Sequence, residues 1–193
     1  MNLNFFLQGI KNIVFNPVKL WEPAKSEDKS TKLIRYSFFF PLALLVTLSA
    51  FFGSMLFTNA ELSPVYSLLF SIKCLLVILL TVYSTSYILG EITYPLDLGK
   101  DFNISFRMVV FSAAPFLICQ ILSRLFESLL FVNIIGFYGF YIFWTGAERM
   151  LNPPQYKKMP LLLATAITFA GIYIVTNLIF SMITDRFYFA FFS

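Results

Sequence analysis

A lysine at position 73 stands inside an otherwise apolar stretch of the chain. It follows Val65, where that stretch begins, by eight residues, which is about 12 Å along a helix. A charged side chain within lipid is costly and therefore indicates a specific role. We favour snorkelling of the Lys73 ammonium toward the nearer membrane interface, in the direction of Glu61. The alternatives are an ion or substrate pathway and an ion pair between helices.

Hydroxyl groups gather further along the same stretch, in the candidate polar site Thr81, Ser84 and Thr85, with Ser86 next to them. Such groups in apolar helices usually bond to a neighbouring helix or to a backbone carbonyl. The same residues would also line a polar cavity, and the sequence is compatible with both arrangements. We expect packing, with the cavity as the alternative.

Residue types needed for catalysis are missing from the sequence. The chain has no histidine, which excludes Ser-His and Cys-His nucleophile pairs and the histidine-dependent zinc sites. It has neither a glycine-rich phosphate loop nor a pair of carboxylates within an apolar stretch. Cys74 and Cys119 lie inside predicted helices, where a structural disulfide is not expected. We therefore expect no enzyme activity, no cofactor and no metal site.

The elements that carry these side chains are five long apolar stretches. Hydrophobic residues make up 59% of the 193-residue chain and charged residues only 12%. A helix needs about 20 predominantly apolar residues to span a bilayer. Continuous rather than alternating apolar character favours helices over barrel strands. We predict an all-α membrane protein, a five-helix transmembrane domain over 34–184 with helices at 34–57, 65–90, 106–124, 128–146 and 160–184.

Residues 1–33 are predicted to form an amphipathic interfacial helix followed by a charged linker, and residues 185–193 a short tail. One helical face collects the apolar side chains Leu3, Phe6, Leu7, Ile10, Ile13 and Val14. Pro17 ends this helix, and Trp21 is the expected interfacial anchor at the level of the lipid headgroups. The helix either rests on the membrane, which we favour, or binds a partner.

Basic residues predict the orientation of the chain. Eleven lysines and arginines fall in the segments on one side of the five stretches and two on the other. Cytoplasmic loops retain positive charge, so we expect the amino terminus inside and the carboxyl terminus outside. The net charge of +4 thus reflects topology and attraction to anionic headgroups. It is no argument for nucleic-acid binding.

Small residues and prolines indicate how the helices pack and bend. Pro41 and Pro115 each remove a backbone hydrogen bond, and Pro115 is the candidate helix bend. Close approach of helix backbones is expected at the small residues Ser49, Gly53, Gly136, Gly139 and Gly146.

Several short motifs follow one another in a recognisable order. They are Asn-Pro-Val-Lys-Leu-Trp-Glu at 16–22, Leu-Gly-Lys at 98–100, Phe-Ser-Ala-Ala-Pro at 111–115, Ile-Gly-Phe-Tyr-Gly-Phe-Tyr at 135–141 and Trp-Thr-Gly at 144–146. In this order the chain resembles the Yip1 family in its bacterial form. The resemblance implies a non-enzymatic protein with five crossings and the amino terminus inside. Eukaryotic members act in vesicle trafficking with small GTPases. Their long amino-terminal region has no counterpart here, so we expect a protein of the bacterial inner membrane.

Two functions fit these features. The first is a membrane adaptor or membrane-organising protein that contacts lipid, a protein partner at the cytoplasmic face, or further copies of itself. It predicts that Lys73→Met leaves function intact. The second is a small oligomeric transporter or channel with a polar pathway near Lys73 and Thr81–Ser86. It predicts that the same substitution abolishes flux in a folded protein.

Overall fold

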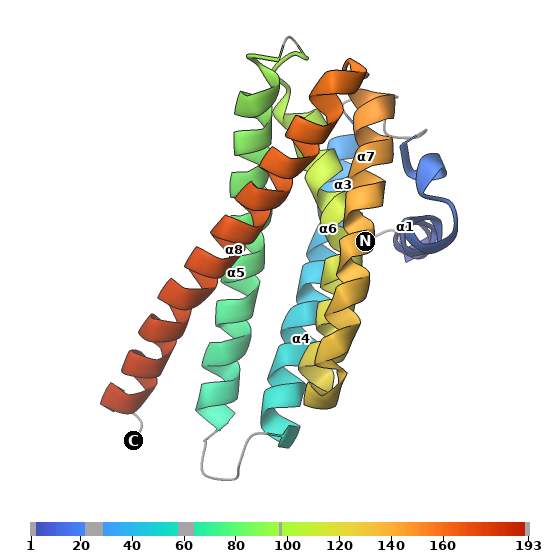
Figure 1. The fold of residues 1–193 in the computed structure, drawn as a ribbon. Helices are drawn as coiled ribbons and strands as arrows, with labels where there is room; N and C mark the ends of the chain where they lie inside the picture. Colours follow the sequence, from blue (N-terminus) through green and yellow to red (C-terminus); the bar gives the residue numbers. More distant parts are fainter. Residues whose placement is uncertain (1–2, 22–28, 58–63, 97, 192–193) are drawn as a thin grey trace.

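The computed structural model describes residues 3–21, 29–57, 64–96 and 98–191, and the regular secondary structure of these ranges is entirely helical (Figure 1). The elements in chain order are α1 (Leu3–Phe15), η1 (Pro17–Leu20), α3 (Lys29–Ile34), η2 (Arg35–Phe39), α4 (Phe40–Phe57), α5 (Pro64–Thr93), α6 (Phe102–Leu125), η3 (Glu127–Phe137), α7 (Tyr138–Met150) and α8 (Gln155–Phe191). The predicted all-α class is confirmed.

Five helical rods are long and apolar enough to cross a membrane, as judged by length and composition. They run over Thr31–Leu56, Pro64–Thr93, Phe102–Leu125, Ser128–Met150 and Gln155–Ala190. The five predicted helices are thus present, and polar residues extend several of them. Asp101 caps the third rod because its Oδ1 accepts hydrogen bonds from the backbone N–H groups of Asn103 at 2.7 Å and Ile104 at 3.4 Å.

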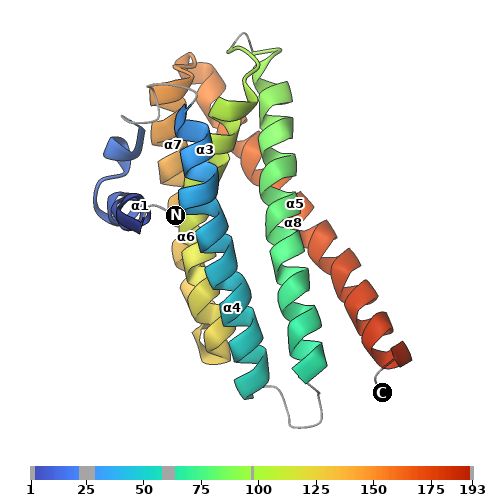
Figure 2. The same cartoon turned by 180° about the vertical axis from the view of Figure 1, so that it is seen from behind.

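Successive rods run in opposite directions, as Figures 1 and 2 show from two sides. The connections at 94–96, 98–101 and 151–154 lie at one end of the bundle, which we call the basic end because Lys100 and Arg149 lie there. The turn at Phe126 lies at the opposite end. With five rods, α3 and the carboxyl end of α8 are at opposite ends of the bundle.

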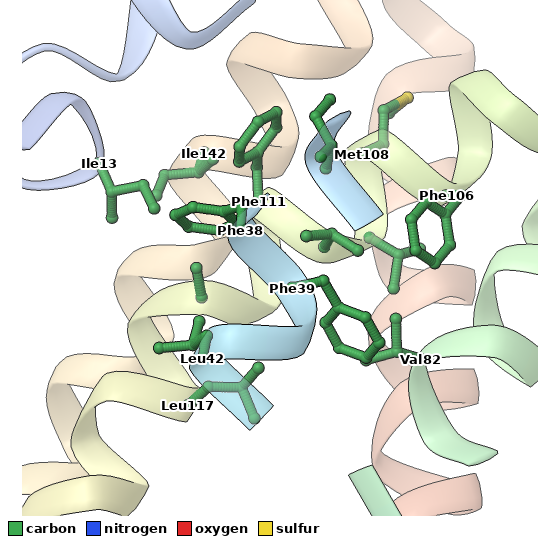
Figure 3. Close-up of a cluster of buried hydrophobic side chains, with 14 of the residues drawn as sticks. Ile13, Phe38, Phe39, Leu42, Val82, Phe106, Met108, Phe111, Leu117 and Ile142 are labelled. Atoms are coloured by element: carbon green, nitrogen blue, oxygen red, sulfur yellow. The ribbon is translucent and has the colours of Figure 1, made fainter. Parts of the chain in front are cut away.

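The apolar core lies toward the basic end, where α4, α6 and α7 meet (Figure 3). The rings of Phe38 and Phe111 have centroids 5.3 Å apart, and Phe39 packs edge-on against Phe106 at 5.9 Å. The Arg35 guanidinium lies 5.3 Å from the centre of the Phe106 ring, a cation–π contact. Aromatic packing therefore fixes the start of the first rod against α6.

Two glycines let helices approach until their backbones touch. A Cβ atom added at Gly139 would overlap the carbonyl oxygen of Ser112 on α6, and one added at Gly53 would overlap that of Arg124. The small-residue packing expected at these positions is present. It places α7 and α4 directly against α6.

The prolines behave differently from each other. The turn before Pro41 is a π-helix over Arg35–Phe39, in which the N–H of Phe40 bonds to the carbonyl of Arg35. A proline lacks the N–H for the regular ladder, and a widened turn of this kind accommodates the loss. By contrast, α6 continues as one helix through Pro115, so the bend expected there stays a prediction.

The amino-terminal segment packs across the side of the bundle near the basic end. Phe6 and Ile13 of α1 are buried against it, whereas Leu3, Leu7 and Val14 are exposed. Part of the apolar face of α1 therefore packs against the bundle, and the rest faces the surroundings of the protein.

The position of Trp21 differs from the one expected from the sequence. Trp21 is 1% exposed, and its Nε1 donates to Thr145 Oγ1 on α7 at 3.2 Å. The ring fits over Gly146, where a side chain would collide with it. The expected anchor in the headgroups is wrong because protein covers the indole completely. Trp21 instead fastens the amino-terminal segment to α7.

Candidate functional site

An apolar cavity of about 430 Å³ lies between α6, the η3–α7 rod and α8, and one side chain of α5 contributes to it. Aromatic rings make up much of its wall, namely Phe116, Phe137, Phe140, Phe143, Phe169 and Tyr173. Clefts of about 300–1,000 Å³ hold drug-sized ligands in proteins. The volume is therefore sufficient for a sizeable apolar molecule.

Small residues create this space. Ala113 on α6, Gly136 and Gly139 on the η3–α7 rod, and Ala166 and Ala170 on α8 all line the cavity. Gly139 brings α7 against α6, whereas α8 makes most of its contacts with α5 and few with α7. The wall formed by α8 is consequently separated from the other two, and the alanines leave the space between them open.

Exposed apolar residues flank the cavity. Ile134, Phe137 and Ile174 all line it, and more than half of the surface of each is accessible. The cavity is therefore reached from the side of the bundle, where the apolar surfaces of the rods lie.

Each rod that lines the cavity contributes polar groups, including Thr165 and Tyr173 of α8. The hydroxyls of Thr85 and Ser112 are buried in its wall and have no hydrogen-bond partner among the described residues. Asn133, in η3, also lines the cavity, and its Oδ1 accepts a hydrogen bond from Gln120 Nε2 at 3.2 Å. The cavity thus has an apolar body with a few hydrogen-bonding groups.

Lys73 lies outside the cavity, between α5 and α8. Its ammonium donates to Ser181 Oγ at 2.6 Å and lies 5.0 Å from the centre of the Phe70 ring. Only 8% of the residue is exposed. Glu61, the expected direction of snorkelling, lies outside the described residues, so that expectation stays a prediction.

A second cation accompanies Lys73. The guanidinium of Arg124, near the end of α6, lies 5.2 Å from the centre of the same Phe70 ring. Its Nε donates to Gln120 Oε1 at 3.2 Å. Since both cations lie about 5 Å from one ring centre, they are no more than about 10 Å apart and repel each other.

Hydrogen bonds connect Arg124 with the cavity. They run from Arg124 to Gln120 and from Gln120 to Asn133, which lines the cavity wall. A void of about 10 Å³ beside Arg124 shares Phe116 and Tyr173 with the cavity. These two rings pack edge to face at 5.3 Å and line both spaces. The polar cluster and the apolar cavity are therefore adjacent.

The structure does not gather the four predicted polar-site residues in one place. Lys73 precedes Thr85 by twelve residues, about 18 Å along α5. Thr85 alone lines the cavity, Thr81 is buried with no partner for its hydroxyl, and Ser84 is half-buried. Sequence reasoning missed the proximity of Arg124, the last residue of the predicted helix 106–124, to Lys73. Its proximity to Lys73 depends on the packing of α5 against α6.

The polar residues at the basic end have structural partners. Lys100 pairs with Glu91, which raises the pKa of the lysine. Arg107 is buried and donates from Nε to Thr31 Oγ1 at 2.7 Å. Across the described residues, no three His, Cys, Asp or Glu side chains are grouped as metal ligands would be. These contacts hold helices and loops together.

Comparison with known proteins adds no relative. No family model, no curated protein and no solved structure matches the chain. Membership of the Yip1 family therefore stays a prediction from the motifs. The function has to be argued from the cavity and the polar cluster beside it.

Proposed function

We propose that this chain is a non-enzymatic membrane-organising protein, of the bacterial Yip1 type, that holds an acyl chain of a membrane lipid in the cavity between α6, α7 and α8. The single observation that carries the proposal is the side cavity of about 430 Å³ in a bundle whose five rods can each cross a bilayer. Its aromatic and alanine lining matches hydrocarbon.

The physical argument concerns what fills such a space in a membrane. A void leaves its lining atoms without contact partners and forfeits dispersion energy. Water gains little there, because a stable water needs two to four polar partners and the lining offers few. An acyl chain entering from the side would restore the contacts. A protein that holds lipids in this way orders the membrane around it.

The orientation belongs to the same proposal. The basic end, with Lys100, Arg149, Lys157 and Lys158, would face the cytoplasm of a bacterial inner membrane. The Phe126 turn and the carboxyl terminus would face outward. A reporter fused to Ser193 should then be active only on the outer side. Activity on the cytoplasmic side would contradict the five-crossing topology.

Cross-linking tests the lipid site. The protein is reconstituted with phosphatidylcholine that carries a photoreactive group in one acyl chain, irradiated and digested. Mass spectrometry should find label on cavity residues such as Phe116 and Phe140. Ala166→Phe fills part of the cavity and should reduce that label, while Ala190→Phe, at an exposed position of α8 outside the cavity, should not. Label spread evenly over the outer surfaces, unchanged by Ala166→Phe, would contradict the proposal.

A second candidate is the small oligomeric transporter or channel. What favours it is the set of buried hydroxyls on Thr81, Thr85 and Ser112, which have no hydrogen-bond partner in the described part of the chain. Lys73→Met and Thr85→Val would test it in vesicles loaded with a pH-sensitive dye. Proton flux in the wild type that both substitutions abolish would support transport. The absence of flux would argue against proton transport.

A further inference from the structure

Lys73, Arg124 and Gln120 form a polar cluster beside the cavity, and among the described residues its cations outnumber the acids near it. Lys73 is buried to more than nine-tenths and carries three N–H donors, of which Ser181 receives one. No carboxylate pairs with Lys73 or Arg124 in the described part of the chain. Among the described residues, Asp185 is an acid near Lys73, and it accepts a hydrogen bond from the Tyr66 hydroxyl at 3.4 Å. A buried cation of this kind is stabilised when an anion joins it.

The depth of Lys73 suits the headgroup region of a membrane. Helix α5 has 30 residues and is about 45 Å long, compared with about 30 Å for the hydrocarbon core of a bilayer. A centred α5 would extend about 7 Å beyond the core at each end. Lys73, about 13 Å from the start at Pro64, then lies about 6 Å inside the core boundary. Its side chain points back toward that boundary, because Cα–Cβ bonds tilt toward the helix amino terminus.

The polar cluster and the apolar cavity are adjacent, as are the charged end and the apolar end of an amphiphilic molecule. Phe116 and Tyr173 border both the void beside Arg124 and the apolar cavity. Gln120 and Asn133 continue the polar contacts from Arg124 to the cavity wall. A molecule with its charged group at the two cations would therefore have its apolar part beside Phe116 at the cavity.

Selectivity has to come from the charged end. A hydrocarbon chain leaving lipid for this cavity gains little hydrophobic energy, because lipid tails are as apolar as the lining. Ionised hydrogen bonds to a phosphate are about twice as strong as neutral ones. Building on the proposed function, we propose that Lys73 and Arg124 bind the phosphate of an anionic membrane lipid whose acyl chain occupies the cavity.

Native mass spectrometry of the full chain in detergent tests this pairing. Phosphatidylglycerol and phosphatidylcholine with identical acyl chains are supplied in equal amounts, and the bound lipids are counted. Both lipids carry a phosphodiester, but phosphatidylcholine also carries a quaternary ammonium, which Lys73 and Arg124 repel. The wild type should therefore retain phosphatidylglycerol about tenfold over phosphatidylcholine, a ratio that corresponds to about 1.4 kcal/mol. Lys73→Met should bring the ratio close to one. Arg186→Gln removes a positive charge from an exposed position on α8 and should leave the ratio unchanged.

Folding is monitored through the unfolding temperature of each variant. Methionine matches lysine in length, and removing a poorly paired buried charge is neutral or stabilising, so Lys73→Met should unfold no earlier than the wild type. If that variant does not fold, Arg124→Gln carries the test and should reduce the ratio as well. An excess of inorganic phosphate should not displace the lipid. Displacement would show that the cations bind free phosphate and would overturn the lipid assignment.

The outcomes separate the two proposals. If Lys73→Met and Arg186→Gln give the same ratio as the wild type, or lower it equally, the charged site is wrong. Ala166→Phe should reduce retention of both lipids. If it does so while no headgroup preference exists, the acyl cavity stands and the anionic headgroup fails. If Ala166→Phe changes the retention of neither lipid, the cavity itself fails as the lipid site, and the proposed combination fails with it.

Discussion

The contact between α6 and α7 at Gly139 can be tested with a single methyl group. In Gly139→Ala the new Cβ overlaps the carbonyl oxygen of Ser112, which is backbone and cannot rotate away. The helices must separate, and overpacking of this kind costs about 1–3 kcal/mol. Alanine returns about 0.5–1 kcal/mol as the better helix former. Because the clash is with backbone, we take the upper end and expect a net loss of about 2 kcal/mol.

Gly171→Ala is the matched control. Gly171 lies in α8, and a Cβ there would meet no atom within 4 Å. The helix-propensity gain is then unopposed, and the unfolding temperature should be unchanged or slightly raised. For Gly139→Ala a loss of about 2 kcal/mol corresponds to a decrease of about 4–8 °C in a chain of this size.

Two buried thiols provide the assay. Cys74 and Cys119 are free and buried, so a thiol-reactive fluorescent maleimide labels them only when the bundle opens. Heating each purified variant in the same detergent with this dye gives its unfolding temperature. The reasoning is refuted if Gly139→Ala unfolds at the wild-type temperature, or if Gly171→Ala shows an equal decrease.

Three other contacts lead to predictions at the basic end. Trp21→Ala removes a fully buried indole, which costs about 3–5 kcal/mol. The amino-terminal segment of this variant should become sensitive to protease, and Trp21→Phe should show a sensitivity between that of Trp21→Ala and that of the wild type. Equal digestion of the wild type and Trp21→Ala would show that the indole does not hold the segment. Thr31→Val removes the acceptor of the Arg107 Nε–H and should cost about 1–3 kcal/mol in thermal unfolding, whereas Thr31→Ser, which keeps the hydroxyl, should resemble the wild type. The Glu91 ion pair raises the pKa of Lys100, so its stabilisation is present below pH 10.5 and is lost as the pH rises through the raised pKa. Both groups are exposed, so the wild type should lose only slightly more stability than Lys100→Gln above pH 10.5, and an equal loss would argue against the pair.

The rods were predictable because a membrane-spanning helix is indicated by the residues of its own segment. A continuous apolar run of about 20 residues predicts a helix with no knowledge of its neighbours. The ends were less predictable, because polar residues continued several helices. The third rod was expected from Phe106 and begins at Phe102, where Asp101 caps it, and the last continues beyond Thr184.

The candidate site depends on tertiary packing, so most of it could not be predicted from the sequence. Phe116, Phe140 and Phe169 belong to three helices, and no local pattern indicates that their rings face one space. Trp21 has the composition of a headgroup anchor, but its partner Gly146 lies 125 residues away. Lys73 was identified from its position alone. Its contact with Ser181 became visible only when α5 and α8 were placed side by side.

The length of α8 has a mechanical consequence. Its 36-residue span is about 54 Å long, more than the roughly 40–45 Å of a whole bilayer with its headgroups. Helices longer than the membrane accommodate the mismatch by tilting, and α8 is inclined to the other rods in Figure 1. Because α8 forms one wall of the cavity, a thinner bilayer would tilt it further and shift that wall relative to α6 and α7. Bilayer thickness would thereby set the width of the cavity.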